Sequence, residues 1–263
     1  MLSDLPGIAI ELLALSALAY LGVCGLLYCV QRQLIYYPQA TRAAIGDTDF
    51  ELVRDGVTLR GWIVNPGRFG AILYFGGNAE RIELNRVRFA HWFPNRTTYL
   101  LAYRGFGASD GTPRERALYA DALALYDQVR ARRPDAPIAL IGRSLGGGVA
   151  SYLASQRPVE RLVLITPFDS LAETAQTHYP WLPARYLIKD RYDSVRHLAN
   201  YRGPVLIVQA GQDEVIPTED TARLVNSLAH CQPTIINVPE ARHNTIDEYA
   251  VFERALAAFV GGP

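Results

Sequence analysis

The sequence predicts an α/β fold in which a mostly parallel sheet carries helices on both faces. Short apolar runs alternate with longer segments of helical periodicity along most of the chain, as expected for such a sheet. The dipeptide Asp55-Gly56 between two strand-like runs predicts a hairpin, which would add an antiparallel edge. At 142–146 a Gly-x-Ser-x-Gly sequence separates an apolar run from a helix-forming one, which predicts a strand, a tight turn and a helix.

Hydrophobic periodicity places the individual elements. The predicted strands are 50–53, 57–64, 71–75, 97–103, 138–141, 161–166, 205–210 and 234–238. The clearest helix is predicted over 113–133, because Thr112 and Glu115 have capping-box spacing and Pro113 suits the first helical position. The interval 167–203 breaks the alternation and is rich in aromatic residues and proline. We expect it to form a small lid insertion with short helices of its own.

The N-terminal segment differs from the rest of the chain. Leu12 to Val30 carry no charge over 19 residues, and a helix of that length spans about 28 Å, close to the roughly 30 Å of a bilayer core. We therefore predict a transmembrane anchor at 1–30, a linker at 31–46 and an α/β domain at 47–263. A cleaved signal peptide and a buried core helix are the alternatives, and the lack of a basic region before the apolar stretch disfavours the former.

Charges on either side of the apolar segment predict its orientation. Arg32 and Arg42 follow the segment, whereas Asp4 and Glu11 precede it. Because basic residues accumulate on the cytoplasmic side of membrane helices, this asymmetry favours a cytoplasmic α/β domain.

Composition and missing motifs exclude several classes of function. The formal net charge is zero, with no basic excess of the kind that nucleic-acid binding requires. In the glycine-rich segment 105–111, Asp110 replaces the third glycine of a dinucleotide fingerprint, and its charge would oppose a pyrophosphate. No His-Glu-x-x-His motif or cysteine–histidine cluster is present, so we expect neither a metal nor another cofactor. The three cysteines do not form a disulfide framework, because two lie in the apolar segment.

Three residues at the ends of predicted strands have the chemistry of a nucleophile, a base and an orienting acid. Ser144 follows the strand at 138–141, Asp213 the strand at 205–210 and His243 the strand at 234–238. Reactive groups gather at the carboxyl ends of strands in open α/β sheets. A serine needs an imidazole to take its proton, and the imidazole needs a carboxylate to fix its tautomer. Ser144, His243 and Asp213 are therefore the predicted catalytic residues.

Other residues compete for two of these roles. Glu214 adjoins Asp213, and Asp169 also follows a strand, so both are alternative carboxylates. We expect the remaining histidines to be structural or solvated, and His91 to be packed, because it adjoins two aromatic residues in a helical pattern. The other three are His178, His197 and His230.

Acyl transfer also requires donors for the developing oxyanion. The N–H of Leu145, directly after the serine, is one candidate. The second is expected in the loop after the strand at 71–75, where we favour the N–H of Asn78 over that of Gly77.

Together these residues resemble the α/β-hydrolase superfamily, and in particular its membrane-anchored, serine-aminopeptidase-like branch, over about 33–259. The motifs that carry the resemblance are Leu34-Ile-Tyr-Tyr-Pro38, Gly77-Asn-Ala79, Tyr103-Arg-Gly-Phe-Gly-Ala-Ser109, Gly142-Arg-Ser-Leu-Gly-Gly147, Pro167-Phe168 and Asp213-Glu-Val-Ile-Pro217. The resemblance implies an α/β-hydrolase fold, a triad of Ser144, Asp213 and His243, and oxyanion donors at Asn78 and Leu145. Two positions depart from the usual pattern: Gly76 stands where relatives carry histidine, and Ala102 where they carry aspartate.

The sequence therefore predicts a membrane-anchored serine hydrolase that cleaves carboxylic esters or thioesters through an acyl-enzyme on Ser144. The anchor and the aromatic insertion favour acyl or lipid-like substrates. An amidase or peptidase with the same triad is one alternative. A scaffold that has lost activity and binds a partner at the membrane is another, to which Gly76 and Ala102 lend some support.

Overall fold

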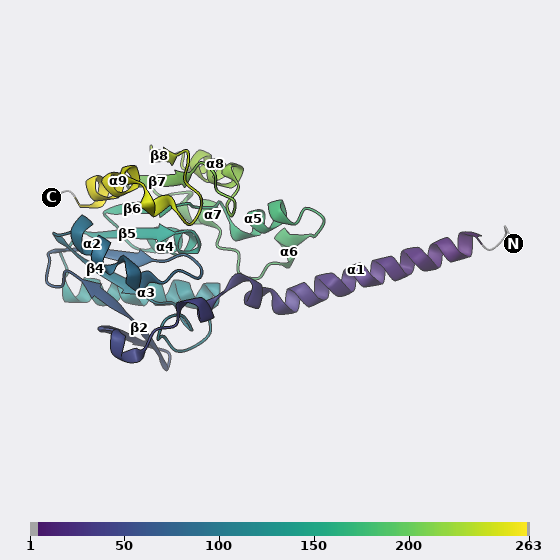
Figure 1. Ribbon diagram of the computed structural model, residues 1–263, viewed down its shortest axis with the longest axis horizontal. Coiled ribbons are helices and arrows are strands. Elements are labelled where there is room, and N and C mark those ends of the chain that lie inside the picture. The colour runs from purple at the N-terminus through teal and green to yellow at the C-terminus, as the bar shows by residue number, and fades with distance from the viewer. Residues whose placement is uncertain (1–4, 262–263) are drawn as a thin grey trace.

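An eight-stranded sheet forms the centre of the structure, a computed structural model that describes residues 5–261 (Figure 1). The strands are β1 (Phe50–Arg54), β2 (Val57–Val64), β3 (Gly70–Phe75), β4 (Arg96–Leu101), β5 (Ile138–Arg143), β6 (Arg161–Ile165), β7 (Val205–Ala210) and β8 (Thr234–Val238). Their order across the sheet is β1-β2-β4-β3-β5-β6-β7-β8. The β1–β2 hairpin pairs antiparallel and β2 runs antiparallel to β4, whereas the other neighbours are parallel. The predicted α/β fold with an antiparallel edge is confirmed.

Helices cover both faces of this sheet. They are α2 (Arg86–Trp92), α3 (Glu115–Arg132), α4 (Leu145–Gln156), α5 (Leu171–His178), α6 (Ala184–Leu187), α7 (Ser194–Leu198), α8 (Thr218–Ser227) and α9 (Ala250–Val260). On one face α4 contacts α3 and α7, and on the other α2 contacts α9 (Figure 1). All residues of β3 and β4 are buried, as expected for strands covered on both sides.

Helix α3 starts later than its sequence predicts. It begins at Glu115 rather than Pro113, with Arg114 as its N-cap residue and no side-chain cap. The Glu115 carboxylate does not turn back toward Thr112. It accepts hydrogen bonds from the N–H groups of Arg191 and Tyr192, at 2.8 and 2.9 Å. A tertiary contact thus takes the place of the predicted capping box.

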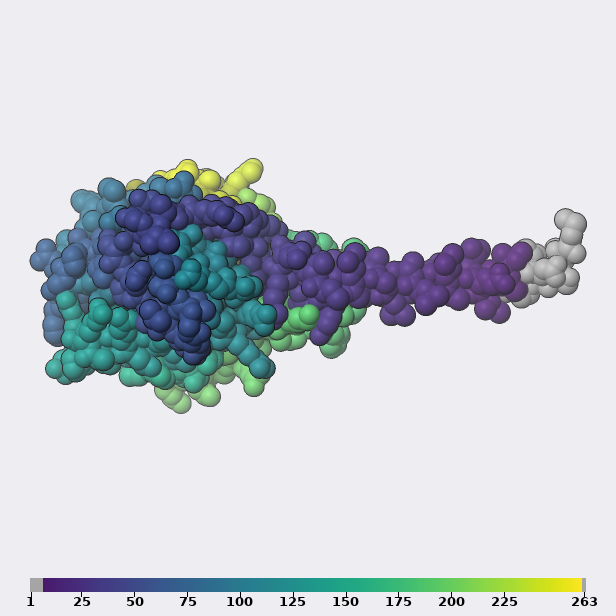
Figure 2. Space-filling model, turned by 90° about the horizontal axis from the view of Figure 1, so that it is seen from below, coloured from purple at the N-terminus to yellow at the C-terminus, as the bar shows by residue number. Residues whose placement is uncertain are grey.

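A long helix, α1 (Leu5–Ile35), projects from the sheet domain (Figures 1 and 2). Among the described residues it is the one helix long and apolar enough to cross a membrane. It extends five residues into the segment 31–46 that we predicted as a linker, and the rest of that segment contains two short 3-10 turns, Pro38–Thr41 and Ile45–Asp47. Helices α5 and α6 of the insertion lie beside the domain-proximal part of α1 (Figure 1).

Candidate active site

Ser144 lies on a strained turn between β5 and α4. Its backbone has φ 49° and ψ −117°, a region that costs a non-glycine residue about 1–3 kcal/mol. The flanking glycines are required by close packing. A Cβ on Gly146 would lie 2.0 Å from the carbonyl oxygen of Phe75, and one on Gly142 would lie 2.4 Å from that of Gly146. The Ser144 N–H donates to the carbonyl of Ile165 at 2.9 Å, which fixes the turn against β6.

The structure brings Ser144, His243 and Asp213 into one hydrogen-bonded line. His243 Nε2 lies 3.0 Å from Ser144 Oγ, and His243 Nδ1 lies 2.8 Å from Asp213 Oδ2. The side chains of His243 and Asp213 are both buried. The three residues come from the loops after β5, β8 and β7, so parallel strands deliver them to one edge of the sheet.

Asp213 is the carboxylate that contacts the imidazole. Its Oδ1 also accepts hydrogen bonds from the N–H groups of Val215 and Ile216, at 2.9 and 2.7 Å, which hold its orientation. Glu214 reaches only the backbone N–H of His243, at 3.4 Å. The other alternative, Asp169, is bonded to Arg223 instead.

Leu145 and Asn78, whose backbone N–H groups we expect to bind an oxyanion, line the same cavity as Ser144. Leu145 is the first residue of α4, so its N–H has no partner within the helix. Within residues 5–261 the Asn78 N–H donates to no acceptor, whereas the Gly77 N–H is already bonded to Glu80 Oε2 at 2.6 Å. This difference favours Asn78 over Gly77, in line with the sequence-based preference.

The loop that carries Asn78 is held by several contacts despite the glycine at position 76. A Cβ on Gly76 would lie 2.4 Å from Cγ2 of Ile82, so Ile82 fills the space beside the loop. The Tyr103 hydroxyl donates to the carbonyl of Gly76 at 2.9 Å. The Asn78 side chain accepts from the N–H of Tyr37 at 3.2 Å and donates to the carbonyl of Ile35. These contacts tie the loop to the sheet and to the end of α1.

Comparison with known proteins gives the family. A family model described as "Serine aminopeptidase, S33" matches residues 88–189. The uncharacterized protein Rv2307c of Mycobacterium tuberculosis is 36% identical over 249 residues, which cover 90% of this chain and 88% of that protein. The chain belongs to this family of α/β hydrolases.

More distant similarities agree with this assignment. The lysophosphatidylserine lipase ABHD12 of Rattus norvegicus is 32% identical over 182 residues, covering 60% of this hydrolase and 45% of the lipase. The structure of Est1E from Butyrivibrio proteoclasticus with bound ferulic acid superimposes with a TM-score of 0.65 at 18% identity, over 81% of this chain and all of that one. At that level of identity the structural likeness supports the fold alone.

Arg143 bridges the loops on either side of Ser144, a role that the sequence alone does not indicate. Its guanidinium lies 3.8 Å from Glu80 Oε1 and 3.7 Å from Asp247 Oδ1, and it donates to the carbonyl of His243 at 3.4 Å. The one sequence feature that could have drawn attention to Arg143 is its position within the Gly-x-Ser-x-Gly sequence. The partners, however, come from segments that only the tertiary fold brings together.

A cavity of about 710 Å³ opens onto Ser144, Leu145 and Asn78. Its other walls come from α1, from α5 and α6, and from residues 214–216 after β7. Most of the lining is apolar, with Leu27, Leu34, Phe168, Leu171, Leu182 and Leu187 among its members. The contribution of α1 was missed from the sequence, because its uniform hydrophobicity does not distinguish a lipid-facing residue from a cavity-lining one.

The remaining histidines have different surroundings. His91 is exposed, so the prediction that it is packed was wrong: the short helix α2 buries Phe89 and Trp92 instead. His178 Nε2 lies 2.8 Å from the carbonyl oxygen of Val215 at the cavity wall. His197 lies edge-on to the rings of Tyr119 and Tyr152, and His230 is exposed. Among residues 5–261 no three His, Cys, Asp or Glu side chains cluster as metal ligands, and the three cysteines are free.

Proposed function

We propose that this protein is a membrane-anchored serine hydrolase that cleaves carboxylic esters or thioesters through an acyl-enzyme on Ser144. The observation that carries the proposal is the line from Ser144 Oγ to His243 Nε2 at 3.0 Å and from His243 Nδ1 to Asp213 Oδ2 at 2.8 Å. These distances suit proton transfer from the hydroxyl to the imidazole.

In the acylation step, Ser144 Oγ attacks the substrate carbonyl carbon while His243 Nε2 takes the hydroxyl proton. Asp213 holds the ring and stabilises the imidazolium that forms. The N–H groups of Leu145 and Asn78 bind the oxyanion of the tetrahedral intermediate. When this intermediate collapses, the bond to the leaving alcohol or thiol breaks, and His243 donates its proton to the leaving group.

Deacylation repeats this sequence with water. His243 takes a proton from a water molecule, which attacks the acyl carbonyl on Ser144. The same N–H groups bind the second oxyanion. Collapse releases the carboxylic acid and returns the proton to Ser144 Oγ. The step needs no additional protein group, because one imidazole acts first as base and then as acid.

Two observations favour acyl esters as substrates. The cavity beside Ser144 is mostly apolar and large enough for a small-molecule substrate. A lysophosphatidylserine lipase is among the relatives. We infer that the acyl group occupies the apolar part of the cavity and that the ester carbonyl lies between Ser144 and the oxyanion donors.

Contacts at the end of α1 join the proposed anchor to the folded domain. Arg32 Nε is bonded to the buried Asp190 at 2.9 Å, and the Tyr36 hydroxyl bonds to the same carboxylate at 3.0 Å. Gln31 bonds both to the carbonyl of Leu187 and to the N–H of Lys189. The end of the helix is therefore part of the folded domain, while Leu12 to Val30 is long enough to span a bilayer.

A fluorophosphonate probe tests the proposal, because it reacts with activated serines. We expect the wild type to be labelled and to hydrolyse p-nitrophenyl acetate. Ser144→Ala should lose both activities, whereas Ser155→Ala, an exposed serine at the end of α4, should keep them. Equal labelling of Ser144→Ala would contradict the proposal. A folded wild type with neither labelling nor turnover would favour the inactive scaffold.

An aminopeptidase is a second candidate, because Glu214 lines the cavity close to His243. A carboxylate there is suited to bind the ammonium group of a peptide N-terminus. This candidate predicts turnover of aminoacyl-naphthylamides that Glu214→Gln reduces at least about tenfold in kcat/KM, with ester turnover unchanged. Ester turnover without any amide turnover would exclude it.

A further inference from the structure

We propose that long-chain substrates enter the cavity sideways from the bilayer, through a window between α1 and the α5–α6 lid. Helix α1 would then serve both as anchor and as one wall of the acyl site. This inference rests on the proposed function and adds to it the substrate class: esters or thioesters whose acyl chain lies in the membrane.

One face of α1 lines the cavity. Val23, Leu27, Gln31 and Leu34 have the spacing of a single helix face, and all four border the same cavity as Ser144. Val23 lies 12 residues before Ile35, which is about 18 Å along the helix axis. The cavity wall thus extends about three turns up the helix, into the uncharged stretch that ends at Val30.

Two sets of polar contacts frame the window between α1 and the lid. Toward the N-terminus, the Tyr20 hydroxyl donates to the carbonyl of Trp181 at 2.9 Å. Toward the domain, Gln31 bonds to Leu187 and Lys189, and Lys189 Nζ lies 3.8 Å from the centroid of the Tyr28 ring. In the described part of the chain, no hydrogen bond joins residues 21–27 to the lid. This stretch presents Val23 and Leu27 to the cavity.

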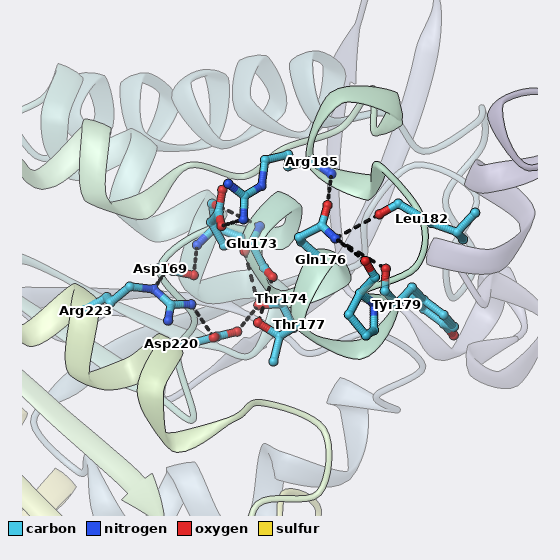
Figure 3. Close-up of polar contacts among 12 residues, drawn as sticks. Asp169, Glu173, Thr174, Gln176, Thr177, Tyr179, Leu182, Arg185, Asp220 and Arg223 are labelled. Carbon is cyan, nitrogen blue, oxygen red and sulfur yellow. Dashed lines mark hydrogen bonds and ion pairs between the residues drawn. The ribbon is translucent and has the colours of Figure 1, made fainter. Parts of the chain in front are cut away.

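The base of the lid is fixed to the hydrolase domain (Figure 3). Thr174 of α5 donates to Asp220 of α8 at 2.6 Å, and Arg223 bonds to both Asp220 and Asp169. Within the lid, Gln176 Nε2 donates to the carbonyl of Leu182 at 2.8 Å. These contacts fix the lid as one wall of the cavity. Substrate entry between α1 and the lid therefore does not require the base of the lid to move.

The tip of the lid carries exposed aromatic residues beside α1. The exposed fractions of Tyr179, Trp181 and Tyr186 are 53%, 60% and 80%. Aromatic side chains of this kind are enriched where proteins meet the membrane interface. Because the tip contacts α1 at Tyr20, within the apolar stretch, we infer that it enters the bilayer that α1 crosses. The window would then open at the depth of the acyl chains.

Blocking the window tests the proposal. Full-length protein is reconstituted in phosphatidylcholine vesicles, and kcat/KM is measured for p-nitrophenyl palmitate and p-nitrophenyl acetate. We expect Leu27→Trp to lower the palmitate-to-acetate ratio by about tenfold or more, because the indole narrows the apolar path. Leu26→Trp is the matched control: Leu26 is 62% exposed and outside the cavity, so its ratio should match wild type. An unchanged ratio in Leu27→Trp, or an equal loss in Leu26→Trp, would overturn the proposal.

A second measurement does not depend on the folding of the Leu27 variant. Trp181 is exposed, whereas Trp62 and Trp92 are buried. We expect dibrominated phosphatidylcholine vesicles to quench the fluorescence of the wild type, and Trp181→Phe to lose most of this quenching. Quenching that is absent, or that persists in Trp181→Phe, would show that the lid does not meet the bilayer. Wild type without Ser144-dependent acetate turnover would instead refute the proposed function.

Discussion

A single carboxylate, Glu80, organises the loop that carries the proposed oxyanion donor. It accepts hydrogen bonds from the Gly77 N–H, from the Tyr74 hydroxyl at 2.6 Å and from the Asn85 amide at 2.7 Å. Arg143 lies beside it at 3.8 Å. Because Glu80 engages the Gly77 N–H, the next N–H in the chain, that of Asn78, is left to face the cavity.

Glu80→Ala should therefore impair turnover more than binding. Without the carboxylate the loop loses the contact that orients it, and misplaced catalytic groups cost up to about 100-fold in rate. We expect kcat for p-nitrophenyl acetate to fall about 10- to 100-fold, with little change in KM. Glu83→Ala, in the same loop but paired with Arg81, is the control and should keep wild-type kcat. A Glu80 variant with unchanged kcat would show that the carboxylate does not position the donor.

The sequence was sufficient to locate the candidate catalytic residues that follow strands. Ser144, Asp213 and His243 could be predicted because strand order brings their loops to one edge. Glu80 and Arg143 could not, because their partners belong to loops that come together only in the folded domain. The position of the Asn78 side chain against the end of α1 has the same origin.

Among the elements, α3 is joined to the sheet by a buried ion pair. Arg104, just after β4, donates through Nε and Nη2 to both carboxylate oxygens of Asp121 in α3, at 2.6 and 2.7 Å. Removing Arg104 would leave the buried Asp121 carboxylate with the more exposed Arg54, at 3.3 Å, as its remaining cationic partner.

We expect Arg104→Ala to lower the free energy of unfolding by about 3 kcal/mol, the low end for a broken buried pair, because Arg54 still partly compensates Asp121. The exposed pair of Arg157 and Asp127 is the control, with similar two-pronged geometry, and Arg157→Ala should cost only about 0–1 kcal/mol. Urea denaturation followed by circular dichroism measures both. A similar loss in the two variants would contradict the distinction between buried and exposed pairs.

Helix α7 introduces a pH dependence through His197. Burial lowers the pKa of this imidazole, with Arg196 acting in the same direction and Asp193 opposing it. Since protonation is easier in the unfolded chain, stability should be full above about pH 6.5 and fall as the pH decreases toward the folded pKa. When the pH is lowered from 7.5 to 5.5, we expect the thermal unfolding temperature to fall less in His197→Phe than in wild type. An identical pH dependence would exclude this role.

Sequence patterns predicted the presence and type of the helices and strands better than the residues at which they begin and end. The buried strands read as continuous apolar runs, so their positions were within a few residues of those observed. The start of α3 was misplaced because Glu115 binds the backbone at Arg191 and Tyr192. The end of α1 was misplaced because Gln31 and Arg32 continue the helix, and Tyr36 follows it, in contact with the insertion.

The whole protein acts at a membrane, as proposed, only if α1 remains there. Leu21 lies near the middle of the apolar stretch and is 64% exposed. An arginine at a helix centre opposes membrane insertion by about 2.5–3.5 kcal/mol. We expect wild type to stay in the membrane pellet after carbonate extraction, and Leu21→Arg to be partly extracted. Gln33→Arg, beyond the stretch, should behave as wild type. A mature chain lacking its first 19 residues would show instead that the segment is a signal peptide.

Capture of the acyl-enzyme would show the covalent step on Ser144 itself. Full-length protein is mixed with p-nitrophenyl octanoate, quenched in acid during the first turnovers and analysed by intact-mass and peptide mass spectrometry. We expect one octanoyl group per chain, located on Ser144 and absent from Ser144→Ala. Turnover that continues in Ser144→Ala, or an acyl group found on another residue, would contradict it.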